Sequence, residues 1–88
     1  MIIQLHRRFE RGYRKLPVRI QEKVRLVIGV FAENPQEPSL RNHALVGRLI
    51  GLRAFSVTND IRIIFEERDG YAVVLMLDVG GHVKVYGE

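Results

Sequence analysis

The residues best suited to chemistry are three histidines and a large set of arginines. The histidines are His6, His43 and His82, and the chain has no cysteine. An imidazole has an unperturbed pKa of about 6.5, so it can take or give a proton near neutral pH. Of the 14 basic residues 11 are arginines, whose planar guanidinium suits two-point contacts with phosphate. These residue types favour proton transfer beside a bound anion.

Charge is distributed unevenly along the chain. The net charge is +4, but residues 1–30 alone carry eight Lys or Arg against Glu10 and Glu22, a local +6. Residues 41–62 add +3, whereas residues 66–88 carry −3. An anionic partner follows as the first hypothesis, and a solvated basic helix face without a ligand is the alternative.

Length and composition limit the function classes. The 88 residues suffice for one domain, residues 1–88, with 47% hydrophobic and 27% charged residues. Without cysteine there are no disulfides, thiolate metal sites or Cys nucleophiles. Apolar runs such as Val73 to Leu77 are far below the roughly 20 residues of a membrane span. We expect a cytoplasmic protein.

Spacing of apolar residues predicts two helices in the first 34 residues. Phe9, Tyr13 and Leu16 mark one stripe of a first helix, which follows a short strand at residues 2–5. A second helix begins at Pro17 and repeats apolar residues from Leu16 to Phe31 at spacings of three and four. It ends at Asn34, because the residue before a proline avoids the helical conformation.

The sequence pattern after the second helix predicts strands joined by tight turns. Their expected ranges are Leu49–Val57, Ile61–Glu66, Tyr71–Asp78 and Val83–Tyr86. Connections this short require antiparallel neighbours, so we expect an α+β fold with two N-terminal helices on one face of a small twisted antiparallel sheet. Alternation puts Ile61, Ile63 and Phe65 on the helix face and Arg62 on the other. An extended ligand could lie on that open face, beside His82 and Tyr86.

Four segments together carry a family resemblance. They are residues 40–47 (LRNHALVG), 51–57 (GLRAFSV), 60–65 (DIRIIF) and 78–86 (DVGGHVKVY). With Lys15-Leu16-Pro17 and the Asn34-Pro35 stop, the sequence resembles the RelE/ParE superfamily of type II toxin–antitoxin toxins, and most closely its RelE/YafQ-like branch. The resemblance implies the RelE-like toxin fold, an endoribonuclease that cuts mRNA, usually on the ribosome, and an antitoxin that holds it inactive.

The resemblance also implies a set of site residues. His43, Asp60 and His82 lie where the YafQ-like branch has active-site His, Asp and His residues. Arg62 matches a phosphate-binding arginine and Tyr86 a functional aromatic, while RNA-binding positions are expected at Arg41, Arg53, Arg62 and Lys84. Ser56 is a departure, because the YafQ-like branch has another histidine there.

RNA cleavage without a metal needs three groups: a base for the 2′-OH, a cation for the phosphate and an acid for the leaving 5′-oxygen. His43 or Asp60 is the candidate base, His82 the acid and Arg62 the cation, with Tyr86 stacking on a base or steadying the phosphate. No cofactor is implied. His43, Asp60 and His82 could in principle form a facial metal site, but the surrounding arginines disfavour a second cation.

Structural alternatives exist for the same residues. Asp60 beside Asn59 is typical of a turn, and Arg62 could pair with Glu66 or Glu67 on the surface. Two other functions share the fold: a ParE-like toxin acting on DNA gyrase, which needs neither His43 nor His82, and a non-catalytic basic module that binds RNA or protein. The expected partners of the first hypothesis are mRNA, the ribosome and an antitoxin with an acidic segment.

Overall fold

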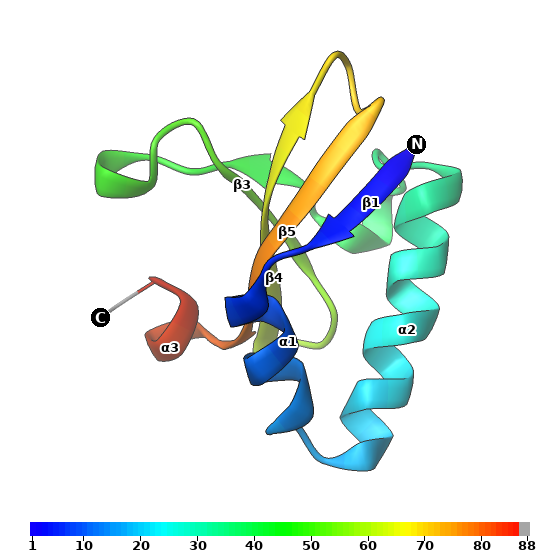
Figure 1. Cartoon of the computed structure of the whole chain (residues 1–88), viewed down its shortest axis with the longest axis vertical. Helices are drawn as coiled ribbons and strands as arrows, with labels where there is room; N and C mark the ends of the chain where they lie inside the picture. The colour runs from blue at the N-terminus through cyan, green and yellow to red at the C-terminus, as the bar shows by residue number, and fades with distance from the viewer. Residues whose placement is uncertain (87–88) are drawn as a thin grey trace.

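A five-stranded sheet in the order β1-β5-β4-β3-β2 forms the centre of the computed structural model, which describes residues 1–86 apart from the side chain of Val83. The strands are β1 (Ile2–Leu5), β2 (His43–Ala44), β3 (Arg53–Ser56), β4 (Ile61–Arg68) and β5 (Val73–Gly81). Short 3₁₀ turns η1 (Pro38–Leu40) and η2 (Gly47–Leu49) flank β2. The long helix stands along one side of the sheet in Figure 1. The predicted α+β fold is confirmed.

Both N-terminal helices form where apolar spacing predicted them. The imidazole of His6 accepts a hydrogen bond from the backbone N–H of Arg8 and so caps α1 (Arg7–Arg14). Helix α2 (Val18–Glu33) begins after Pro17 and ends at Asn34. Helix α2 buries Val24, Val27 and Phe31 in the core against the sheet.

The main core lies between these helices and the sheet. Phe31 stacks on Phe55 with ring centroids 4.5 Å apart and meets Phe65 edge-on at 5.0 Å. Phe9 of α1 and Met76 of β5 join the same cluster. A smaller cluster of Ala54, Ile64 and Val85 covers the opposite face. The predicted division of β4 into two faces is therefore confirmed.

Strand directions differ from the prediction at one edge. β2, β3, β4 and β5 are antiparallel in sequence order, but β1 pairs in parallel with β5, with Ile2 opposite Val73. Tight turns constrain only the strands they connect. β1 is separated from β5 by both helices and by β2, β3 and β4, so no tight turn fixes its direction against β5.

Three predicted strands were wrong in whole or in part. Residues 83–86 belong to a helix, α3 (His82–Tyr86), residues 49–52 belong to the end of η2 and the loop before β3, and the strand predicted at Tyr71–Asp78 begins and ends later, at Val73–Gly81. Over so few residues an alternating apolar pattern does not distinguish strand from helix. In Figure 1 the loop between β2 and β3 extends away from the sheet, and α3 lies below it.

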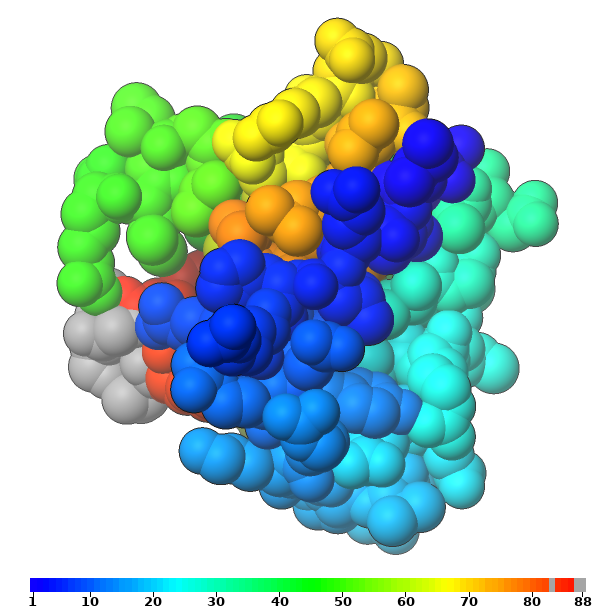
Figure 2. All heavy atoms as spheres, in the orientation of Figure 1, coloured from blue at the N-terminus to red at the C-terminus, as the bar shows by residue number. Residues whose placement is uncertain are grey.

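Two glycines give this loop its path. Gly47 and Gly51 have φ values of 67° and 95°, a region that residues with a Cβ avoid. Between them Ile50 is 77% exposed, and Val46 before them is 83% exposed. Figure 2 shows the loop standing out at the side of the molecule, with the surface hollowed between it and α1. No helix within residues 1–86 is long and apolar enough to span a membrane.

Candidate active site

A cleft of about 660 Å³ opens between the β2–β3 loop and α3. Residues 44–47 and Leu49 form one wall. Five side chains with polar groups also line it: His43, Arg48, Arg62, His82 and Tyr86. The volume falls in the range of small-ligand sites. Four of the five were predicted site residues.

Strand register explains why His43 and Arg62 share this face. His43 pairs with Ala54, and Ala54 pairs with Ile64. Residues directly opposite on paired strands point to the same face, as do residues two apart on one strand. Arg62 precedes Ile64 by two, so His43 and Arg62 both project away from the Phe55 and Ile63 core.

A backbone contact fixes the imidazole of His43. Its Nδ1 lies 2.8 Å from the carbonyl oxygen of Arg41, a residue in the left-handed conformation with φ of 53°. A carbonyl oxygen can only accept, so Nδ1 carries the hydrogen in this contact. In the neutral ring Nε2 then keeps its lone pair and can act as a base.

Arg62 is held by the turn between β3 and β4. One guanidinium nitrogen donates to the carbonyl oxygen of Thr58 at 2.7 Å and to that of Ile61 at 3.3 Å. No carboxylate in the described part of the chain pairs with it: Glu66 pairs with Arg68, and Glu67 accepts from the N–H of Tyr71. Its positive charge therefore faces the cleft without a counter-ion from residues 1–86.

Helix α3 supplies His82 and Tyr86, which are four residues apart and meet ring to ring. Their centroids are 4.3 Å apart and the ring planes meet edge to face at 65°. Burial raises the pKa of the Tyr86 phenol, and the nearby positive charge of Arg62 opposes that rise in part. Tyr86 is therefore a neutral donor at physiological pH, close to Arg62.

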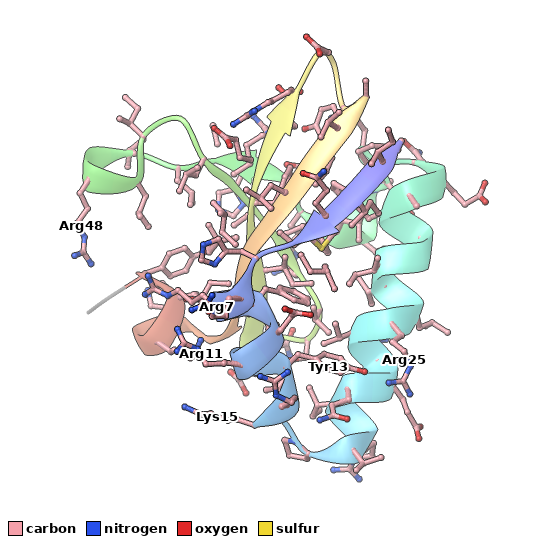
Figure 3. All side chains as sticks on the ribbon, viewed as in Figure 1. Arg7, Arg11, Tyr13, Lys15, Arg25 and Arg48 are labelled. Carbon is pink, nitrogen blue, oxygen red and sulfur yellow. The ribbon has the colours of Figure 1, made fainter. Side chains whose placement is uncertain are left out.

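Arg48 is a cleft residue that sequence reasoning did not select. Its guanidinium donates to the carbonyl oxygen of Tyr86 at 2.5 Å, which links the loop to the end of α3. Figure 3 shows the side chain directed from the loop toward α3. The only sequence signal was its place in the basic segment 41–62, which does not distinguish it from its neighbours.

Other predicted residues lie outside the cleft lining. Asp60 is exposed in the β3–β4 turn, where its N–H donates to the hydroxyl of Thr58. Arg53 donates through Nε to the side chain of Asn42 at 2.9 Å. Arg41 contributes its carbonyl to His43, and Lys84 donates to Asp78 at 2.5 Å. Their roles in catalysis and RNA binding stay predictions.

Ser56 is opposite Arg62 in the β3–β4 register, but it borders a separate hollow beside α2. Ser56 is not among the residues that line the cleft. Within residues 1–86 there is also no group of three or more His, Asp or Glu residues placed to hold a metal ion.

Comparison with known proteins places the fold among bacterial toxins. No family model and no curated protein sequence matches the chain. Among solved structures, YafQ from Escherichia coli strain BL21(DE3) is 18% identical, with 97% of each chain covered and a TM-score of 0.81. The YoeB/ParE toxin from Agrobacterium tumefaciens is 15% identical, with 93% of this chain and 99% of that chain covered and a TM-score of 0.76.

A toxin–antitoxin complex is also similar. RelBE2 from Mycobacterium tuberculosis matches with 22% identity, 92% of this chain and 96% of that chain covered, and a TM-score of 0.66. At these identities the similarity establishes the fold, and the chain has the RelE/YafQ-like toxin fold.

Proposed function

We propose that this protein is the toxin of a type II toxin–antitoxin system and acts as a metal-independent endoribonuclease on mRNA. The observation that carries the proposal is one cleft lined by His43, Arg62 and His82. These side chains are a proton acceptor, a fixed cation and a second imidazole. They are the three groups that cleavage through a 2′-hydroxyl requires.

His43 is the preferred general base. Its Nδ1 hydrogen is directed to the Arg41 carbonyl, so Nε2 is available to take the proton of the 2′-OH. The 2′-oxygen then attacks the adjacent phosphorus, and the bond to the 5′-oxygen breaks. Asp60, the other candidate base, has an exposed position outside the cleft lining.

Arg62 and His82 serve the phosphate and the leaving group. The Arg62 guanidinium, fixed by two carbonyl oxygens, stabilises negative charge on the phosphate as the 2′-oxygen attacks. Protonated His82 donates its proton to the departing 5′-oxygen. Tyr86 lies against His82 and stays a neutral phenol, so it can donate a hydrogen bond to a phosphate oxygen or stack on a base.

The cleft wall favours a single-stranded substrate. Leu45, Val46 and Leu49 present apolar side chains beside the arginines. Unstacked bases bind apolar and aromatic surfaces, whereas a duplex hides its base faces. Messenger RNA in an extended form, such as that held on a ribosome, meets this requirement.

An antitoxin with an acidic segment is the expected protein partner. RelBE2, which shares the fold, was solved as a toxin–antitoxin complex. In this chain, residues 1–30 carry the local +6, and Figure 3 shows Arg7, Arg11 and Lys15 spaced along α1 with their side chains directed outward. Opposite charge on a partner would speed association and orient it.

The test uses purified protein, ribosomes and a defined mRNA, with and without EDTA. We expect cleavage that continues in EDTA, 5′ ends that map to discrete positions, and products that end in a 2′,3′-cyclic phosphate. The matched control is a folded His43→Ala/His82→Ala double variant, which should leave the mRNA intact. Equal cleavage by this variant would contradict the mechanism, and loss of cleavage in EDTA would indicate a metal-dependent one.

A cellular measurement separates this proposal from action on DNA gyrase. Expression of the chain alone in bacteria should stop growth, with protein synthesis falling before any DNA-damage response. An early DNA-damage response with intact mRNA would instead support a ParE-like function.

A further inference from the structure

We propose that Asp78 and Lys84 form a positioning device that fixes α3 and thereby sets the places of His82 and Tyr86 in the cleft. This inference rests on the proposed nuclease function for its kinetic consequences. The control of α3 by the ion pair is inferred separately, from contacts that lie outside the cleft. Neither residue lines the cleft, so each would act through its neighbours.

Asp78 is the buried polar side chain at the centre of this arrangement. It lies on β5, and its side chain is only 6% exposed. Oδ1 accepts the N–H of Val79 at 2.9 Å and the ammonium of Lys84 at 2.5 Å. Oδ2 lies 3.3 Å from Nε of Arg8 on α1. One carboxylate thus joins β5 to α1 and to α3.

Two glycines make room for the Lys84 side chain. A Cβ on Gly80 would lie 2.6 Å from Cδ of Lys84, which is closer than van der Waals contact allows. A Cβ on Gly12 of α1 would lie 3.0 Å from Nζ of Lys84 and 2.6 Å from the carbonyl oxygen of Val79. The lysine stem therefore runs across Gly80, and its end lies beside Gly12.

The ammonium of Lys84 is already bound. Besides Asp78 it donates to the carbonyl oxygen of Val79 at 3.1 Å. An amine that is shared between a buried carboxylate and a carbonyl would have to break both bonds to reach a phosphate. This geometry assigns Lys84 an anchoring role in preference to the RNA-binding role predicted from sequence.

Helix α3 needs such an anchor because it is short. It has five residues, whereas isolated helices shorter than about 12 residues are marginal in water. Its conformation must come from tertiary contacts. Burial of Val85 and the Arg48 bond to the Tyr86 carbonyl provide two, and the ion pair between Lys84, whose side chain is 43% exposed, and the buried carboxylate of Asp78 provides a third. His82 and Tyr86 lie on either side of Lys84, so its loss should shift both.

The kinetic test compares Asp78→Asn, Lys84→Met and the double variant. Because a misplacement of about 1 Å can cost about 10²-fold in rate, we expect each single variant to lose about 10²-fold in kcat. KM should change by no more than about twofold, since RNA-binding groups remain. The double variant should be no slower than either single variant, because both remove the same contact.

Arg68→Met is the matched control, since it breaks an ion pair with Glu66 on the exposed end of β4. It should cleave at the wild-type rate. If Lys84 instead contacts RNA, Lys84→Met alone should raise KM and lower the salt dependence of binding, while Asp78→Asn should not. That result would overturn the proposal.

A structural measurement tests the device independently of cleavage. In nuclear Overhauser spectra the wild-type protein should show contacts between the His82 and Tyr86 rings, and Asp78→Asn and Lys84→Met should lose or weaken them while contacts in the Phe31 core persist. Unchanged ring contacts in both variants would overturn the proposal. If the wild-type protein does not cleave RNA, the proposed function fails, but these spectra still decide whether the ion pair controls α3.

Gly80→Ala gives a second route that leaves both charges in place. Its methyl group should displace the Lys84 stem and weaken the same ring contacts, and in a Lys84→Ala background the glycine substitution should have a smaller effect, limited to the backbone strain of an alanine at a φ of 159°. Additive effects of the two substitutions would contradict the close packing on which the device depends.

Discussion

The two faces of the sheet are stabilised in different ways. On the helix side Phe31, Phe55 and Phe65 are fully buried and pack ring against ring. On the cleft side the buried cluster consists of the smaller side chains of Ala54, Ile64 and Val85 among the described residues, and polar contacts of Asp78, Arg48 and Arg62 help to position the remaining elements.

This difference indicates that the helix side of the sheet provides most of the stability and that the cleft side carries the groups for chemistry. A large aromatic core can hold the sheet without help from the opposite face, because burial of apolar area is the main favourable term in folding. The cleft face can then carry several arginines with few compensating carboxylates. Substitutions on the two faces should therefore affect different properties.

The largest effect on folding should come from Phe31→Ala. Removal of a fully buried phenylalanine typically costs about 3–5 kcal/mol, because it removes apolar burial and leaves a cavity. Chemical denaturation followed by circular dichroism would measure the loss. Val46→Ala, at a side chain that is 83% exposed, should change the free energy of unfolding by less than about 0.5 kcal/mol. Equal effects at the two positions would remove the distinction between the faces.

On the cleft face the largest effects should be on rate. His43→Ala and His82→Ala should each lower cleavage by about 10²–10⁴-fold, because each removes a proton-transfer group. The wild-type pH–rate profile should be bell-shaped. His43→Ala should lose the limb that reports deprotonation of the general base, and His82→Ala should lose the limb that reports deprotonation of the general acid. Stability should stay near that of the wild type in both. A profile unchanged in shape would remove these histidines from proton transfer.

Arg62→Ala should also weaken RNA binding, and this effect should be smaller than the effects on rate. Each phosphate contact on single-stranded RNA contributes a slope of about −0.7 to the dependence of log K on log salt concentration, so the slope should fall by about one contact. Fluorescence anisotropy with a short RNA over a salt series would measure it. Arg68→Ala is the control, because Arg68 pairs with Glu66 outside the cleft. An unchanged slope would restrict Arg62 to holding the β3–β4 turn.

The smallest effect should be that of Tyr86→Phe, and it should depend on pH. Burial raises the pKa of this phenol above its ordinary value of 10.0. Above pH 10.0 the unfolded chain loses this proton before the folded protein does, so wild-type stability falls with rising pH until the folded-state pKa is passed. Phenylalanine has no ionisable group, so the free energy of unfolding of Tyr86→Phe should fall less over this pH range. Parallel stability curves of the two proteins through this range would contradict the raised pKa.

Local sequence signals were sufficient for much of the fold. Apolar spacing predicted α1 and α2, Pro17 and Asn34 predicted the ends of α2, and alternation separated Ile63 and Phe65 from Arg62 and Ile64. These signals are strong because each depends on residues close in the chain. The resemblance of four segments to the RelE/YafQ-like toxins agrees with the fold similarity found by structure.

Within the candidate site, the sequence selected four of the five cleft side chains with polar groups. It did not select Arg48, and it did not foresee the ion pair between Lys84 and Asp78. Both differences involve contacts between residues 6 to 38 positions apart, which no local pattern records.

The sequence by itself determined helices α1 and α2, the alternation of the strands and the types of residue available for chemistry, because these features depend on the shape and polarity of residues that are close together in the chain. The tertiary structure alone decided that residues 82–86 form a helix, that β1 runs parallel to β5, and that His43 comes from the sheet edge to the same cleft as His82. The physical reason is length. A five-residue segment and a two-residue strand have too little intrinsic preference to fix their own conformation, so the surfaces that they pack against fix it for them.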